Sequence, residues 1–299
     1  MIKLCLGTVQ FGMDYGIQGG RRPSASESAA IIGEAVSGGV DAIDTAAAYG
    51  EAESVVGRFF ASRPDVREGI FLVSKFGTDL FGGAARVGFG GRLADAARSS
   101  LARLETDWLD AYICHVATAV RDDAVIDAMA AVKSEGLARK VGFSVYETDE
   151  ALAAIDSGAV DFLQVPYSVL DQRMARAGVF EKAAARGVEV HARSAFVQGL
   201  ALMDADAVPG WLVGARRLVR DLEGLCADAG TTRRRLALAF VRRRRGISHL
   251  VFGVDDARQL GEILADFHAP VADAVLDEAE RMFADVDPGL VMPNKWRKA

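Results

Sequence analysis

Short apolar runs alternate with longer amphipathic segments along nearly the whole chain. The runs are rich in branched aliphatic residues and almost uninterrupted by polar ones, which is typical of strands covered on both faces. Eight strands are predicted: Ile2–Gly7, Val40–Asp44, Ile70–Lys75, Leu109–Cys114, Lys140–Phe143, Phe162–Val165, Val188–Ala192 and His249–Phe252. Because such strands alternate with helices, the pattern favours a parallel sheet.

Helical periodicity fills the segments between the strands. The predicted helices are Ala25–Ser37, Glu51–Ala61, Leu93–Leu104, Ala124–Glu135, Thr148–Ile155, Val179–Arg186, Val213–Ala229 and Arg233–Arg243, followed by Ala257–Leu264 and Val271–Phe283. Ser24 with Glu27 is a capping-box pattern, and Thr231 or Thr232 is placed to cap the helix that begins at Arg233. The fold class predicted is α/β, a (β/α)8 TIM barrel forming a single domain over residues 1–299 with extra C-terminal helices.

A doubly wound open sheet is the main alternative to the barrel. That fold usually shows a G-x-G-x-x-G turn after an early strand, and this chain contains none. Two connections are long for a barrel of this kind, Thr78–Arg92 and Ser194–Trp211. Both follow the C-terminal ends of strands, where barrels keep their chemistry, so both are candidate lids or binding loops.

Composition narrows the class of protein without identifying it. The 299 residues are 51% hydrophobic and 25% charged, with a net charge of −6, so nucleic acid is not an expected partner. Cys5, Cys114 and Cys226 are scattered and lack zinc spacing, so no metal site is expected and a reduced, cytoplasmic setting is predicted. The N-terminus has no signal-peptide pattern, and no apolar run has the length of a membrane span.

Four polar residues at the ends of successive predicted strands suggest a reaction. Asp44 ends the second strand and Tyr49 follows it, Lys75 ends the third, and His115 follows the fourth. A phenol has a pKa near 10, but a lysine ammonium stabilises the phenolate and a carboxylate holds the lysine. A histidine nearby can orient a carbonyl. Together the four side chains are suited to placing a proton on a carbonyl oxygen.

Each of these residues also has a purely structural interpretation. An aspartate before a helix is often a cap or turn former, a tyrosine before glycine is often a rim aromatic, and a histidine after a strand is often a satisfied core residue. The lysine is harder to explain structurally, because a buried ammonium without a partner is costly. The conjunction of all four on strands two, three and four carries the prediction.

Longer motifs in the same order resemble those of the aldo-keto reductases. The matching segments are LGTVQFG (6–12), DTAAAYGEAESVVG (44–57), SKFG (74–77), LDAYICH (109–115), GLARKVGFSVY (136–146), LQVPYSVLDQR (163–173), ARSAFVQGL (192–200) and LVFGVDDARQLGEIL (250–264). The resemblance implies that Tyr49 is the general acid, that Lys75 lowers its pKa, that Asp44 pairs with Lys75, and that His115 binds the carbonyl. It implies hydride transfer between a nicotinamide cofactor and a sugar or a small aldehyde or ketone, without a metal.

The same resemblance assigns residues to an extended cofactor at the barrel mouth. They are Gly7, Thr8, Asp44, Ser144, Gln164, Arg193, Ser194, Phe196, Gln198, Gly199, Gly253, Val254, Asp256, Gln259 and Glu262. The chain departs from the family pattern at Val145, where an asparagine is common, and at Arg193, where an aromatic residue commonly stacks on the nicotinamide. Asp255 and Asp256 stand where relatives that use NADPH often carry a cation, which favours NAD(H) over NADP(H).

A basic segment, Arg233–Arg245, leaves a second function open. Its arginines have two interpretations, a solvated helix face or a docking surface for an acidic protein partner. With the changes at Val145 and Arg193, this surface allows an alternative to the enzyme. The alternative is a catalytically weak or inactive NAD(H)-binding regulator that acts through protein contacts, similar to an oxidoreductase-like regulator of bacterial cell division.

Overall fold

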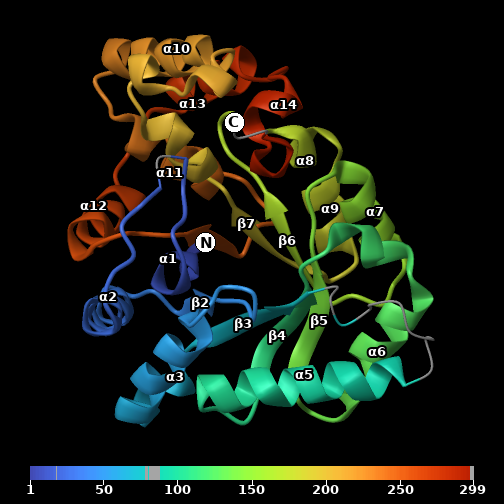
Figure 1. Ribbon diagram of the computed structural model, residues 1–299. Helices are drawn as coiled ribbons and strands as arrows, with labels where there is room; N and C mark the ends of the chain where they lie inside the picture. The colour runs from blue at the N-terminus through green and yellow to red at the C-terminus, as the bar shows by residue number, and fades with distance from the viewer. Residues whose placement is uncertain (18, 78–79, 81–87, 297–299) are drawn as a thin grey trace.

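Eight parallel strands close into a barrel in the computed structural model, which describes residues 1–296 except 18, 78–79 and 81–87 (Figure 1). The strands are β1 (Lys3–Gly7), β2 (Ala42–Asp44), β3 (Phe71–Phe76), β4 (Leu109–Cys114), β5 (Ala138–Ser144), β6 (Phe162–Pro166), β7 (Glu189–Arg193) and β8 (His249–Phe252). Each strand pairs with the next in sequence, and β8 pairs with β1. The predicted (β/α)8 barrel is therefore confirmed.

Helices surround the barrel as the periodicity indicates (Figure 1). They are α2 (Ala25–Ser37), α3 (Ala52–Ser62), α5 (Phe89–Leu104), α6 (Asp123–Ser134), α7 (Thr148–Asp156), α9 (Val179–Ala185), α10 (Ala215–Asp228), α11 (Arg233–Arg242), α12 (Ala257–Phe267) and α13 (Asp273–Met282). Single-turn helices α1 (Val9–Gly12), α4 (Pro64–Arg67), α8 (Arg173–Arg176) and α14 (Pro288–Val291) lie in connections. Helix α5 begins before the predicted Leu93, and β5 is longer at both ends than predicted.

Local sequence signals account for several element boundaries. The capping box at α2 is present in full: Ser24 accepts from the Glu27 amide, and the Glu27 carboxylate accepts from the Ser24 amide at 2.8 Å. Thr232 caps α11 by accepting from the Arg235 amide. Gly142 is required where β5 meets β6, because a Cβ there would lie 1.7 Å from the Phe162 carbonyl oxygen.

The barrel has a separate apolar core inside its sheet. Val73, Ala111, Ile113 and Phe162 point inward from β3, β4 and β6, and they are completely buried. The larger hydrophobic core lies between the sheet and the helices. Since the interior is filled at mid-height, polar chemistry is confined to the two ends of the barrel.

Charged side chains form a hydrogen-bonded floor at the N-terminal ends of the strands. His191 Nε2 lies 3.2 Å from Glu189 Oε1, and His249 Nε2 lies 3.2 Å from Asp41 Oδ1. Lys140 pairs with the other oxygen of Glu189. Although Glu189, His191 and His249 bring three possible ligand atoms within 4.8 Å of one another, these carboxylates already have donors. The cluster is therefore explained as a structural network that closes the barrel.

The cysteines and the helix lengths agree with the picture given by composition. Cys5, Cys114 and Cys226 are buried free thiols, and burial raises the pKa of each. Among the helices that the structure describes, none combines the length and the apolar composition that a membrane crossing needs.

Candidate active site

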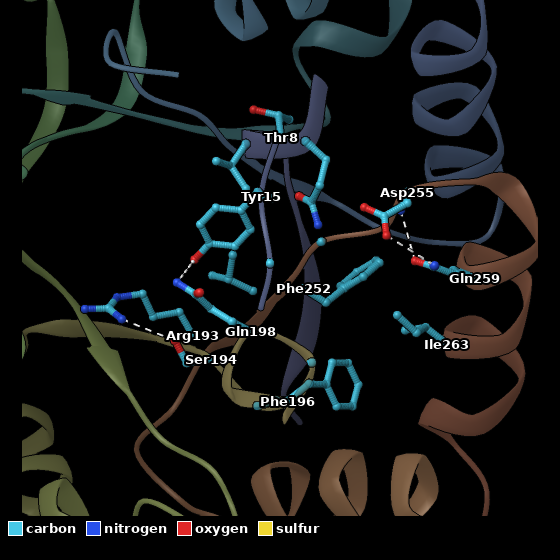
Figure 2. A pocket seen from close by; sticks show the side chains of 18 of the residues that line it. Thr8, Tyr15, Arg193, Ser194, Phe196, Gln198, Phe252, Asp255, Gln259 and Ile263 are labelled. Atoms are coloured by element: carbon cyan, nitrogen blue, oxygen red, sulfur yellow. Dashed lines mark hydrogen bonds between the residues drawn. The ribbon is translucent and has the colours of Figure 1, made fainter. Parts of the chain in front are cut away.

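A cavity of 540 Å³ opens at the C-terminal ends of the strands, the end opposite the charged floor (Figure 2). Tyr49 and Asp44 line it at one point, and residues of β1, β6, β7 and β8 and of α12 complete its wall. Of the two long connections predicted at this rim, the one after β7 contributes Ser194, Ala195, Phe196, Gln198, Gly199 and Leu202 to the cavity wall. Most of the other, Thr78–Arg92, lies outside the described residues.

A buried ion pair lies directly beneath the cavity. Lys75 Nζ donates to both carboxylate oxygens of Asp44, at 2.7 and 2.6 Å, and to the Thr45 carbonyl at 2.9 Å. The side chain of Lys75 is 0% exposed and that of Asp44 is 5% exposed. The Gln164 amide donates to Asp44 Oδ1 at 2.6 Å. The lysine thus has the carboxylate partner that its burial demands.

Tyr49 presents its hydroxyl to this ion pair. The Lys75 ammonium lies 3.4 Å from the Tyr49 oxygen and 4.9 Å from the centre of the ring. Burial raises the pKa of the Tyr49 phenol well above its usual range, and Asp44 raises it further. The lowering of this pKa by Lys75 stays a prediction. The consequence of burial is a phenol that keeps its proton.

His115 completes the group of four residues. Its ring meets that of Tyr49 edge to face, with centroids 5.7 Å apart. Burial lowers the pKa of the His115 imidazole to about 4, and the Lys75 charge acts in the same direction. The ring is therefore neutral at physiological pH, with one N–H to donate and one lone pair to accept. The structure brings together all four residues that the strand ends predicted.

Acidification is expected to destabilise the fold partly through His115. Its pKa is lowered in the folded state relative to about 6.5 in an unfolded chain, so the unfolded chain binds the extra proton first. The contribution of neutral His115 to the free energy of unfolding is fully present above pH 6.5 and is lost as the pH falls through about 4. The loss is on the order of 3 kcal/mol. Urea unfolding of the protein and of His115→Asn between pH 4 and 7 measures this, and the variant should show a shallower pH dependence.

His268→Asn is the matched control for this measurement, because His268 is exposed on the surface. It should leave the pH dependence as it is. Burial also lowers the pKa of His191 and of His249, the latter to about 4, so the His115 variant should keep part of the slope. Equal slopes for His115→Asn and the unaltered protein would contradict the assignment to His115.

Most of the residues assigned to the cofactor line the cavity. They are Gly7, Thr8, Asp44, Gln164, Arg193, Ser194, Phe196, Gln198, Gly199, Gly253, Gln259 and Glu262. Ser144, Val254 and Asp256 are not part of the wall. Ser144 and Val254 are buried in the fold. The Asp256 side chain caps α12 by accepting from the backbone N–H of Gln259 at 2.7 Å. Asp255, its neighbour, is the carboxylate that faces the cavity (Figure 2).

The end of the cavity at α12 carries a set of paired charges. Glu262 accepts from Arg234 and from Arg258, both at 2.8 Å. Asp255 Oδ2 accepts from the side-chain amide of Gln259 at 3.4 Å. Asp255 Oδ1 is buried and has no partner in the described part of the chain. Burial raises the pKa of Asp255. The cations at this end are thus paired with Glu262, and the Asp255 carboxylate lines the wall beside them.

These features fit a dinucleotide. Two acceptors of the wall, Asp255 Oδ1 and Gln10 Oε1, are buried without a hydrogen-bond donor among the described residues. Such orphaned acceptors are costly unless a ligand supplies donors, and ribose hydroxyls are donors of that kind. A Cβ on Gly253 would lie 2.5 Å from the Gln10 side chain, so glycine keeps the wall open there.

Two segments join over the cavity. Gln198 donates through its side chain to the Tyr15 hydroxyl at 3.1 Å, and its backbone carbonyl accepts from the Ile17 amide at 3.1 Å (Figure 2). Ser194, Val197 and Gln198 all have positive φ, at 65°, 49° and 54°. Left-handed backbone is unusual for residues other than glycine, above all for a β-branched valine, and it concentrates at ligand sites.

Arg193, at the end of β7, is another cation of the same cavity wall. Its guanidinium lies 4.2 Å from the centre of the Tyr146 ring and donates to the Val145 carbonyl at 2.9 Å and to Ser194 Oγ at 3.2 Å. The Val145 side chain is fully buried and is not part of the cavity wall. The two departures from the family pattern are thus linked, since Arg193 binds the backbone of Val145.

The basic segment is largely satisfied by the chain itself. Arg234 and Arg235 both bind Asp266, at 2.7 Å, and Arg243 binds Asp277 at 2.6 Å. Arg244 binds Glu181 at 2.6 Å. These arginines hold α11 against neighbouring helices, although the Arg235 side chain is still 47% exposed. A solvated face or a docking surface for this segment stays a prediction.

Several residues of the cavity wall were not expected from the sequence, Arg234 and Gln10 among them. Arg234 was predicted as part of the basic segment, but α11 runs from the cavity end to the floor, so its first turn lies beside the cavity. The position of Arg234 could have been predicted, because the helix that precedes a strand begins at the C-terminal side of the barrel. Gln10 lies in the connection after β1, where no pattern distinguishes a wall residue.

Comparison with known proteins agrees with the arrangement. The sequence model of the Aldo/keto reductase family matches residues 3–282. The NADH-specific methylglyoxal reductase of Escherichia coli is 26% identical over 79% of this chain and 81% of its own length. An aldo-keto reductase of Mycolicibacterium smegmatis is 36% identical, over 40% of each chain.

Solved structures show the same fold. Aldo-keto reductase AKR11C1 from Bacillus halodurans, in its holo form, superposes with a TM-score of 0.77 at 20% identity, covering 99% of this chain and 95% of that one. An aldo/keto reductase from Klebsiella pneumoniae in complex with NADP and acetate has a TM-score of 0.69 at 22% identity, over 94% and 92% of the two chains.

Proposed function

This chain belongs to the aldo/keto reductase family of NAD(P)H-dependent oxidoreductases, and on that premise we propose that it reduces a small carbonyl compound, with Tyr49 as the proton donor. The observation that carries the proposal is the contact between the Tyr49 hydroxyl and the buried Lys75–Asp44 pair at the cavity wall. The proposed proton donor, the ammonium that would stabilise its phenolate and the cavity for the reactants are therefore adjacent.

Each of the four residues has a distinct part in the proposed reaction. Reduced nicotinamide supplies the hydride for the carbonyl carbon when it is bound. Tyr49, protonated because burial raises its pKa, gives its proton to the carbonyl oxygen. Lys75 stabilises the phenolate left behind, and Asp44 fixes Lys75. Neutral His115 donates a hydrogen bond to the same carbonyl oxygen.

The substrate proposed is a sugar or a small aldehyde or ketone. The cavity has to hold the cofactor and the substrate together, which favours a small substrate. A relative named as a methylglyoxal reductase acts on a small aldehyde, which supports this size class. The regulator alternative has no comparable support, because the arginines proposed as its docking surface are bound within the chain.

A steady-state assay tests the proposal. A panel of sugars, aldehydes and ketones is offered with NADH and with NADPH, and oxidation of the cofactor is followed by absorbance. Turnover of one or more carbonyls above that of Tyr49→Phe supports the proposed reductase. A panel without turnover above that variant counts against it.

NAD(H) is the cofactor we expect to bind more tightly, because the Asp255 carboxylate lines the cavity. A carboxylate accepts from ribose hydroxyls but repels a 2′-phosphate, and Glu262 already occupies Arg234 and Arg258. At pH 8, Asp255→Asn should improve the affinity for NADPH relative to NADH about tenfold or more. Fluorescence titration with both cofactors measures the ratio.

Asp256→Asn is the matched control, since Asp256 caps α12 and does not line the cavity. Asparagine is an equally good cap, so this variant should keep the original ratio. If both variants shifted the ratio alike, the effect would belong to α12 and not to the Asp255 carboxylate. Tighter binding of NADPH than NADH by the unaltered protein would contradict the preference itself.

A further inference from the structure

The reacting end of the cavity carries one cation that no carboxylate of the described chain neutralises. The Lys75 charge is balanced by Asp44, at 2.6 Å. Arg193 differs: its partners in the described residues are the Val145 carbonyl, Ser194 Oγ and the Tyr146 ring, all of them neutral. With Tyr49 and His115 also uncharged, the described residues at this end of the cavity carry a net positive charge.

Arg193 is held in place, yet it keeps donors for a ligand. Stacking on Tyr146 and the bond to Val145 fix the plane of the guanidinium. Two of the five N–H groups of a guanidinium are used in the bonds to Val145 and Ser194, so the remainder are available. Figure 2 shows the side chain at the cavity, beside Ser194. A fixed guanidinium fork is suited to a carboxylate, which it binds through two parallel hydrogen bonds.

Arg193 shares its cavity with the proposed proton donor. Arg193 and Tyr49 both line the wall, and the Arg193 charge lowers the pKa of Tyr49 and of His115 against the larger effects of burial. A substrate that meets Tyr49 in this cavity therefore shares it with the cation. A neutral sugar or aldehyde would leave the guanidinium without a counterion.

We propose that Arg193 is a specificity-determining residue that binds an anionic group of the substrate, so that the preferred substrates are small carbonyl acids. The inference rests on the proposed reductase function and refines its substrate class. A cavity shared with the cofactor favours short chains in which a carboxylate lies a few bonds from the carbonyl.

Pairs of an acid and its methyl ester test the effect of the substrate's charge separately from its carbonyl. Glyoxylate and 4-oxobutanoate are compared with their methyl esters, at low and high ionic strength. The unaltered protein should show a higher kcat/KM for each acid by about tenfold or more. Arg193→Gln should remove that preference, so that the kcat/KM of each acid falls to that of its ester whatever the effect on cofactor affinity, and Arg193→Lys should restore part of it. Arg220→Gln, outside the cavity wall, should behave as the unaltered protein.

Failure of this inference is separable from failure of the proposed function. If the esters were reduced as well as the acids, and Arg193→Gln had the same ratio of kcat/KM for acid and ester as the unaltered protein, the reductase function would stand and the anion site would be overturned. Weaker cofactor binding by Arg193→Gln with an unchanged ratio would assign the residue to the cofactor instead. If no carbonyl is reduced, a binding measurement still tests the anion site. In the presence of NAD⁺ or NADP⁺, 4-oxobutanoate should bind more tightly than its ester, and Arg193→Gln should abolish that difference in affinity. Equal binding of acid and ester would overturn the inference.

Discussion

Replacing Tyr49 with phenylalanine is expected to lower kcat by about 10²- to 10⁴-fold, the contribution of a positioned general acid. The substitution removes one oxygen atom and keeps the ring that packs against His115. Without the hydroxyl, the carbonyl oxygen has no acid at the point where Lys75 supports a phenolate. The loss should appear in kcat and kcat/KM alike, because the interaction forms as the proton is transferred. Stopped-flow and steady-state measurements with the best carbonyl of the panel test it.

Tyr15→Phe is the matched control for this substitution. Tyr15 also lines the cavity, and its hydroxyl accepts from Gln198 instead of facing the ion pair. Its loss should loosen the contact between the two segments over the cavity and change KM more than kcat. Both variants should still bind cofactor by fluorescence titration. A Tyr49→Phe protein that kept its kcat would show that another group delivers the proton.

The barrel and its four central residues could be predicted because their signals are local. Buried parallel strands read as continuous apolar runs, so β3 and β4 were found almost to the residue. Polar residues at the ends of such strands must share one rim, which brought Asp44, Lys75 and His115 together without any knowledge of distances. The partner of Lys75 followed from the cost of a buried ammonium.

The α12 end could not be predicted in the same way. Which of two adjacent aspartates caps a helix and which faces a cavity depends on the path of the chain between β8 and α12, and Asp255 and Asp256 have the same chemistry. The structure resolves it: Asp256 caps and Asp255 faces inward. The raised pKa of Tyr49 was equally hidden, because it depends on burial and on the charge of Asp44.

Removing Lys75 alone is expected to destabilise the fold strongly. Lys75→Met keeps most of the side-chain volume but leaves the Asp44 carboxylate, which is 5% exposed, without its cation. Removal of one partner from a buried pair typically costs about 3–5 kcal/mol in the free energy of unfolding. Lys3→Met is the matched control, because it breaks a pair with Asp41 in which the lysine is 61% exposed, and such pairs contribute about 1 kcal/mol or less. Urea unfolding at pH 7 compares the two.

The double variant Asp44→Asn, Lys75→Met separates the stability of the pair from its function. With both charges gone, the desolvation cost disappears as well, and the Gln164 amide still has the asparagine oxygen as an acceptor. Most of the stability lost in Lys75→Met should therefore return, a coupling of about 2 kcal/mol or more between the two sites. Turnover should not return, because the phenolate of Tyr49 would still lack its cation. A double variant as unstable as Lys75→Met would mean that the ammonium stabilises the fold through its bond to the Thr45 carbonyl and not through Asp44. The expected result, a stable and inactive protein, would place the ion pair in the site for its chemistry, since an uncharged pair can hold the fold.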